Sequence, residues 1–138
     1  MKHINKRKYP SPPMFVLFSS FLTLNLACRD NQQDIIGQEI RDVIKDTIPP
    51  HAIMAGATQI DKNTTRVLGL WEFQSSGDWK QYAEWVTKNL TGRYELIATE
   101  ENSLNFRRSL TGDIYNLQIQ SSSTNPLHVR VDFIARPN

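Results

Sequence analysis

The spacing of apolar residues changes along the chain and predicts a different element for each segment. Ile36, Ile40, Val43 and Ile44 recur at helical intervals, which predicts an amphipathic helix that ends before Pro49-Pro50. The polar side of this helix would carry Glu39, Arg41, Asp42 and Lys45. The small and mixed residues of 51–63 predict a loop.

The pattern then alternates with a period of two and returns to a helical period. Residues 65–74 predict a strand that has Val67, Trp71 and Phe73 on one face and Leu68 and Leu70 on the other. A capping box of Asp78 and Gln81 begins the second helix. Its apolar stripe consists of Trp79, Tyr82, Ala83, Val86 and Leu90. Gly92 is expected to end this helix in the left-handed conformation.

Sustained alternation after Gly92 predicts four more strands. They fall within residues 94–99, 104–110, 115–120 and 127–135, and Gly112 in the second turn is free to adopt a positive φ. The expected fold class is therefore α+β: an N-terminal helix plus a helix packed on a curved antiparallel sheet. The order of strand, helix and four strands resembles the cystatin-like roll in topology. The glutamine-valine-glycine loop of cystatin inhibitors is not found after the helix, and folds of this kind host many functions.

The N-terminus has the three parts of a secretory signal. Residues 1–13 are basic and interrupted by proline, and residues 14–27 form a largely apolar run that ends in Ala27. Arg29 and Asp30 end this run too early for a membrane-spanning helix, which needs about 20 apolar residues. We expect cleavage after Ala27.

The single cysteine of the chain, Cys28, directly follows the signal. The segment Leu24-Asn25-Leu26-Ala27-Cys28 resembles the lipobox of bacterial lipoproteins, although Asn25 occupies a position that is usually Leu. The resemblance implies a lipid anchor on Cys28 in the cell envelope. Arg29 at the next position favours the outer membrane, with the domain facing the periplasm. The alternative is an incidental cysteine near an ordinary cleavage site.

These features divide the chain into three parts and change the meaning of its charge. We expect a signal peptide (1–27), a lipidated cysteine with a polar tether (28–34) and a single α+β domain (35–138). The formal net charge of +2 includes four basic residues of the signal, and the remaining 111 residues carry 12 basic and 14 acidic residues. The mature net charge of −2 gives no support for a nucleic-acid binder.

Few residues of the mature chain suggest chemistry. His51 and His128 have no cysteine or histidine neighbour at metal-ligand spacing, and the six glycines are scattered singly. We therefore expect no metal, no cofactor and no catalytic residues. Candidate binding residues are Arg107, Arg108, His128, Arg130 and Trp85.

Each of these candidates has a structural alternative. One polar face of the sheet would carry Arg107, His128 and Arg130. This face suits binding to an envelope protein, a glycan or lipid head groups. The alternative is an ordinary solvated face. Arg108 falls on the apolar side of its strand, where it would snorkel, mark a bulge or line a pocket. Trp85 lies away from the apolar stripe, either as a contact surface or packed beneath the first helix.

Two functions follow from these expectations. The first is a membrane-anchored binding or assembly module of the bacterial envelope, and the alternative is a small envelope enzyme or protease inhibitor with a pocket between helix and sheet. An Arg108 without a partner and among converging polar groups would favour a pocket. A filled apolar interior would favour an interaction surface.

Overall fold

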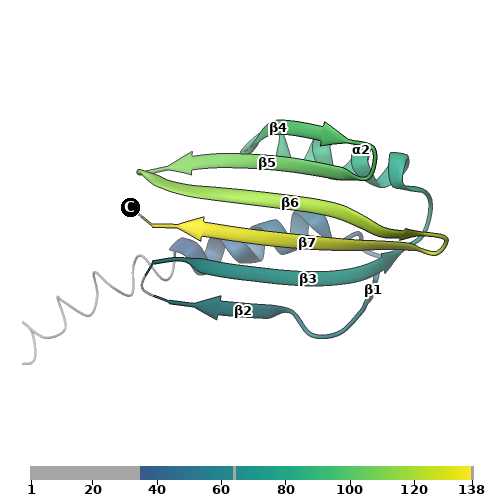
Figure 1. Ribbon diagram of the computed structural model, residues 1–138, viewed down its shortest axis with the longest axis horizontal. Coiled ribbons are helices and arrows are strands. Elements are labelled where there is room, and N and C mark those ends of the chain that lie inside the picture. Colours follow the sequence, from purple (N-terminus) through teal and green to yellow (C-terminus); the bar gives the residue numbers. More distant parts are fainter. Residues whose placement is uncertain (1–34, 64, 138) are drawn as a thin grey trace, which may run out of the picture. The chain divides into compact units, whose positions relative to one another are not determined.

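Seven strands form one antiparallel sheet in the part of the chain that the computed structural model describes, residues 35–63 and 65–137 (Figure 1). The strands are β1 (Ile53–Met54), β2 (Gln59–Lys62), β3 (Val67–Ser75), β4 (Glu95–Glu100), β5 (Ser103–Leu110), β6 (Asp113–Thr124) and β7 (Leu127–Arg136). Their order across the sheet is β1-β3-β7-β6-β5-β4, and β2 also pairs with β3. The predicted α+β class with an antiparallel sheet is therefore confirmed.

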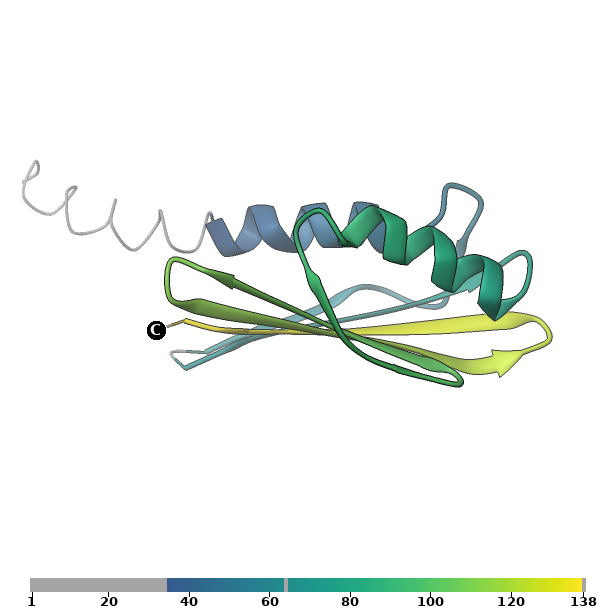
Figure 2. The ribbon, with the colours of Figure 1, turned by 90° about the horizontal axis from the view of Figure 1, so that it is seen from above.

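Two helices lie on one face of this sheet (Figure 2). Residues 35–47 are helical, and α2 spans Trp79–Leu90. The predicted capping box at the start of α2 is confirmed, because Asp78 Oδ1 accepts a hydrogen bond from the Gln81 N–H at 2.8 Å and the Asp78 N–H donates to Gln81 Oε1. The prediction for Gly92 is wrong: Thr91 caps the helix in a right-handed conformation, and Gly92 is not among the glycines with positive φ.

α2 joins two strands that lie far apart in the sheet. β3 pairs with the last strand, β7, whereas β4 forms the opposite edge and pairs only with β5 among the described residues. From β4 onward the chain turns back at each strand end, so that β4, β5, β6 and β7 follow one another across the sheet. The positive φ expected at Gly112 is found in the turn between β5 and β6.

The core lies between the helices and the inner face of the sheet. Alternate residues of β3, β6 and β7 are buried, which is the pattern that period-two spacing predicts. The largest fully buried side chains are Trp71, Tyr115, Phe73, Phe106, Phe133, Leu90, Leu117, Ile119 and Leu127. Gly69 lies close to this core: a Cβ there would be 3.1 Å from the Trp71 ring.

The predicted loop over residues 51–63 is partly wrong, since it contains β1 and β2. Both are short edge strands that pair with β3, Ile53 opposite Gln74 and Ile60 opposite Gly69. All six of their side chains are exposed, so no alternation of apolar and polar residues marks them in the sequence.

β4 also differs from its prediction. The register shifts between Leu96 and Ala98, which interrupts the expected alternation and leaves Ile97 in a bulge. Leu96 is 37% exposed and Ile97 is 54% exposed, so neither of these apolar side chains is buried. Leu96 lies in an open groove beside α2 and is not covered completely, whereas Ile97 lines a shallow depression with Asn105 and Arg107 on the face away from the helices.

Candidate functional site

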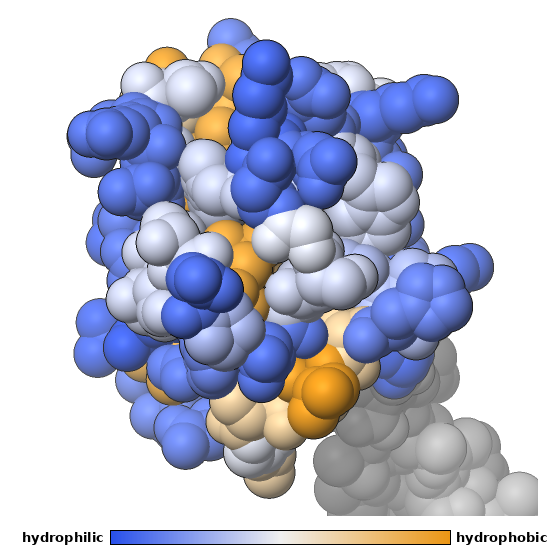
Figure 3. Space-filling view, turned by 90° about the vertical axis from the view of Figure 1, so that its right-hand side faces the viewer, coloured by the Kyte–Doolittle hydropathy of each residue, from blue (hydrophilic) through white to orange (hydrophobic). Residues whose placement is uncertain are grey.

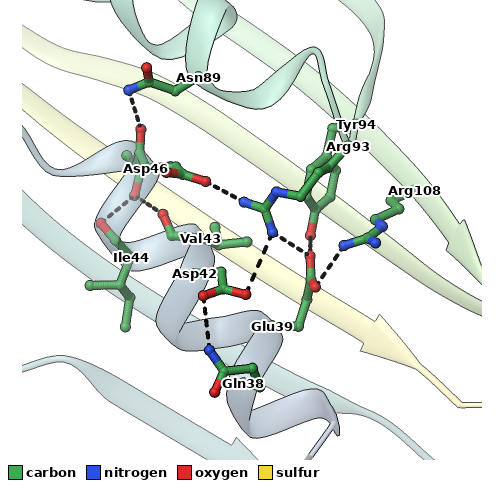
Figure 4. Close-up of polar contacts among 11 residues, drawn as sticks. Gln38, Glu39, Asp42, Val43, Ile44, Asp46, Asn89, Arg93, Tyr94 and Arg108 are labelled. Atoms are coloured by element: carbon green, nitrogen blue, oxygen red, sulfur yellow. Dashed lines mark hydrogen bonds and ion pairs between the residues drawn. The ribbon is translucent and has the colours of Figure 1, made fainter.

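Glu39 and Arg108 form an ion pair on the inner side of the fold (Figure 4). Arg108 Nη1 lies 2.7 Å from Glu39 Oε2, and the Tyr94 hydroxyl donates to Glu39 Oε1 at 2.6 Å. The placement of Glu39 on the polar side of its helix is wrong: only 5% of the residue is exposed, and it lies one turn from the buried Ile36 and Val43. Alternation places Arg108 on the apolar face of β5, and Glu39 provides the partner for its charge there.

Arg93 extends this cluster along the helix of residues 35–47. Its guanidinium donates to Asp46 and lies 3.6 Å from Glu39 Oε1 and 3.9 Å from Asp42 Oδ2. The Asn89 amide of α2 donates to the Asp46 carbonyl at 3.2 Å. These contacts join the helix of residues 35–47 to α2 and to the segment that enters β4 (Figure 4).

A second buried contact holds the same helix near its C-terminal end. The Trp71 indole N–H donates to Thr47 Oγ1 at 3.0 Å, and Thr47 Oγ1 donates to the Val43 carbonyl at 2.8 Å. The Tyr82 hydroxyl of α2 donates to the Thr47 carbonyl at 2.8 Å. Thr47 therefore links both helices to β3.

Burial governs the ionisation of the tyrosines around these contacts. Burial raises the pKa of Tyr82, and burial together with the hydrogen bond to Glu39 raises the pKa of Tyr94 above the ordinary value of 10.0. Burial followed by the charges of Asp113 and Glu39 raises the pKa of Tyr115. All three hydroxyls therefore stay protonated at neutral pH.

The polar groups inside the fold are mostly engaged with one another. Among the described residues, only Ser103 Oγ and the Tyr115 hydroxyl are buried side-chain polar atoms without a hydrogen-bond partner. Within the same residues, no group of three or more His, Cys, Asp or Glu side chains converges to hold a metal ion. The interior thus fits a packed core with a paired ion cluster.

The sheet face opposite the helices carries three of the predicted binding residues. Arg107, His128 and Arg130 lie there on β5 and β7, and Arg107 is exposed. Arg130 Nε donates to Asp132 at 3.0 Å, and its Nη1 lies 3.9 Å from Glu72. The hydrogen bond and charge of Asp132 raise the pKa of Arg130. Arg130 therefore keeps its positive charge, and Asp132 and Glu72 partly offset it on this face.

Trp85 does not provide an exposed contact surface. It is partly buried against the core, and its ring centroid lies 6.0 Å from that of Tyr82. Trp85 therefore packs against the core, and the cited ring contact is with Tyr82 of its own helix.

Sequence reasoning missed an open groove between α2 and the edge strand β4. It has a volume of about 660 Å³, and its apolar part is formed by Trp79, Ala83, Leu96 and Leu104. Lys80, Glu84 and Lys88 line its helix side, and Glu100 and Glu101 line its strand side. Alternation alone does not show this groove, because the sequence does not show that Leu96 is 37% exposed beside α2.

The surface view shows where apolar groups reach solvent (Figure 3). Apolar surface shows between hydrophilic side chains at the upper side of this view, the side on which β4 and α2 lie in Figure 1. Apolar surface also shows at the lower side of this view. On β1, Ile53 is 67% exposed and Met54 is 40% exposed. Both edges of the sheet thus expose apolar side chains.

The expected signal cleavage at Ala27 and lipidation of Cys28 lie outside the described residues. Among the residues that are described, no helix has both the length and the apolar character needed to cross a membrane.

Comparisons with known proteins give no relative from which a role could be transferred. No family model matches the chain, and no curated protein or solved structure resembles it significantly.

Proposed function

We propose that the chain is a lipid-anchored protein of the bacterial envelope that acts as a binding or assembly module. The anchor would be Cys28, and residues 29–34 would separate the folded part from the bilayer. The proposal for the anchor is supported by the basic start, the apolar run and the lipobox-like segment before Cys28. More than one acyl chain on this cysteine would give stable attachment.

The binding role is supported most directly by the pairing of Arg108 with Glu39 at 2.7 Å. A pocket enzyme would be expected to keep such a guanidinium available for substrate, whereas here a buried carboxylate of the same chain holds it. The groove between α2 and β4 is open at the surface and partly apolar, which suits contact with a partner.

Two other functions have less support: an enzyme or inhibitor, and a module that binds an acidic partner. A small envelope enzyme or inhibitor is the alternative, and the proposed resemblance to the cystatin-like roll is its main support. An acidic partner on the face of Arg107 and Arg130, such as a glycan or lipid head groups, is disfavoured because Asp132 and Glu72 flank Arg130.

The anchor is tested by fractionation and intact mass of the full chain and of Cys28→Ser. Because the chain has one cysteine, any thioether-linked lipid must be on Cys28. We expect the wild type in the membrane fraction with the mass of an acylated product that begins at Cys28. The variant should be soluble or accumulate as the precursor. A soluble wild type without lipid mass would contradict the proposed anchor.

The binding role is tested by crosslinking in spheroplasts with a membrane-impermeant lysine reagent. A specific adduct of the anchored protein with another envelope component is the expected result. A protein that crosslinks to nothing, over a range of spacer lengths, would contradict a binding or assembly role.

A further inference from the structure

We propose that β4 binds an extended segment of a partner protein as an added strand, and that this segment alternates basic residues with apolar ones. The inference rests on the proposed binding role and specifies its site and its partner chemistry. The apolar side chains of the segment would enter the groove beside α2, and its basic side chains would lie on the opposite face of the sheet.

The backbone of β4 is available for such pairing. β4 pairs with β5 on one side and with no other strand among the described residues. Its other side therefore presents N–H and C=O groups, interrupted by the bulge at Ile97, and an incoming strand can pair on either side of that bulge. The four central residues Leu96–Thr99 carry no charge that would keep a strand away.

The groove determines which side chains of the incoming strand are apolar. Leu96 and Thr99 of β4 pair with Phe106 and Leu104, so they face the helix side of the sheet. Both line the groove together with Trp79 and Ala83 of α2. An added strand beside β4 would project alternate residues over this apolar surface and cover it.

Carboxylates on β4 determine the character of the other side chains. Glu95 pairs with Arg107, which places it on the face away from the helices. Glu100 pairs with Ser103 at the end of β4, and Glu100 and Glu101 of the following turn also border the end of the groove. Glu95, Glu100 and Glu101 are exposed, and none of them is in an ion pair within the described part of the chain. Lysine or arginine at alternate positions of the partner would meet this row of acidic groups.

A second copy of the chain fits this edge less well. Symmetric antiparallel pairing of two β4 strands would set Glu95 of one copy against Glu100 of the other, and like charges opposite each other are unfavourable.

The other edge of the sheet is protected from strand addition by charged side chains, because β2 carries Asp61 and Lys62 within four residues. The charge pattern therefore favours a basic partner segment at β4.

The test uses the full chain in phosphatidylcholine nanodiscs and three labelled synthetic peptides of seven residues. One alternates lysine with valine or isoleucine, one replaces every lysine with glutamate, and one has a central proline. Fluorescence anisotropy should show saturable binding of the first peptide alone, weakened by salt. Empty nanodiscs provide the background.

Variants locate the binding site on the protein. Leu96→Lys should weaken binding by about tenfold or more, because it places a charge in the groove. Ile60→Lys on the opposite edge, where Ile60 is 47% exposed, is the matched control and should leave binding unchanged. Glu95→Gln with Glu100→Gln should reduce both affinity and salt dependence, whereas Glu72→Gln should not.

Three results would overturn the inference. If the glutamate peptide binds as tightly as the lysine peptide, the charge argument is excluded. If the proline peptide binds as tightly, strand addition is excluded. If Leu96→Lys and Ile60→Lys weaken binding equally, the site at β4 is excluded. Concentration-dependent dimers that Leu96→Lys abolishes, with no peptide binding, would show that a second copy is the occupant. Because the peptide assay uses no cell envelope, its failure is distinct from failure of the anchor or of the crosslinking test.

Discussion

Removing Arg108 should destabilise the fold far more than removing its neighbour Arg107. Arg108 is 21% exposed at its side chain and pairs with Glu39, whose side chain is 6% exposed. Breaking a buried pair by removing one partner typically costs about 3–5 kcal/mol, because the other charge stays buried. Arg108 is partly solvated and Arg93 Nη1 remains 3.6 Å from Glu39, so we expect about 2–4 kcal/mol for Arg108→Met.

A double-mutant cycle measures this coupling. Glu39→Leu also deprives the Tyr94 hydroxyl of its acceptor, and an unsatisfied buried donor costs about 1–3 kcal/mol. The double variant Glu39→Leu with Arg108→Met should be more stable than the sum of the single losses predicts, by about 1–3 kcal/mol.

The assay is urea unfolding of the full chain in detergent, followed by tryptophan fluorescence and analysed by linear extrapolation. Arg107→Met is the matched control, since Arg107 is exposed, and it should change the free energy of unfolding by less than about 0.5 kcal/mol. Equal losses for Arg107→Met and Arg108→Met, or additive losses in the cycle, would refute the ion-pair argument.

Three further predictions concern the core. Val86→Ala should cost about 1–3 kcal/mol because Val86 is fully buried, while Lys80→Ala should be nearly silent; equal urea midpoints would contradict this. Thr47→Val should cost about 1–3 kcal/mol by leaving the Trp71 N–H without an acceptor, and an unchanged midpoint would exclude that bond. Burial raises the pKa of Tyr94, so the contribution of its protonated hydroxyl to the free energy of unfolding is complete below about pH 10 and is lost as the pH rises further. Tyr94→Phe should therefore make the free energy of unfolding fall less steeply above about pH 10. An unchanged slope would contradict this prediction.

The strongly periodic segments could be predicted from the sequence. The stripe of α2 and the alternation in β5, β6 and β7 each require one buried face, and burial follows these patterns closely. Residues such as Asp78 and Gly112 marked a cap and a turn because their local chemistry suffices to form them.

The edges of the sheet could not be predicted in the same way. β1 and β2 are held by backbone pairing with β3, and their side chains bury no face. The bulge in β4 reverses the orientation expected after Leu96, and no residue type in that strand announces it.

The candidate site was hidden for a related reason. Glu39 was placed among solvated charges because a helical pattern cannot show that an arginine 69 residues away would be its partner. Asp132 lies two residues from Arg130 on the same face, and this spacing indicated partial neutralisation, whereas the contact of Arg130 with Glu72 of β3 did not follow from the spacing. Pairing between charges depends on tertiary contacts, which spacing alone does not give.

Hydrogen exchange of the nanodisc-bound full chain tests the central claim most directly, by comparing backbone amides with and without the alternating lysine peptide. Strand addition predicts slower exchange in Glu95–Glu100 of β4 and unchanged exchange in Gln59–Lys62 of β2. If the peptide binds but amide exchange in β4 is unchanged, or if protection is confined to β2 or β7, strand addition at β4 is contradicted.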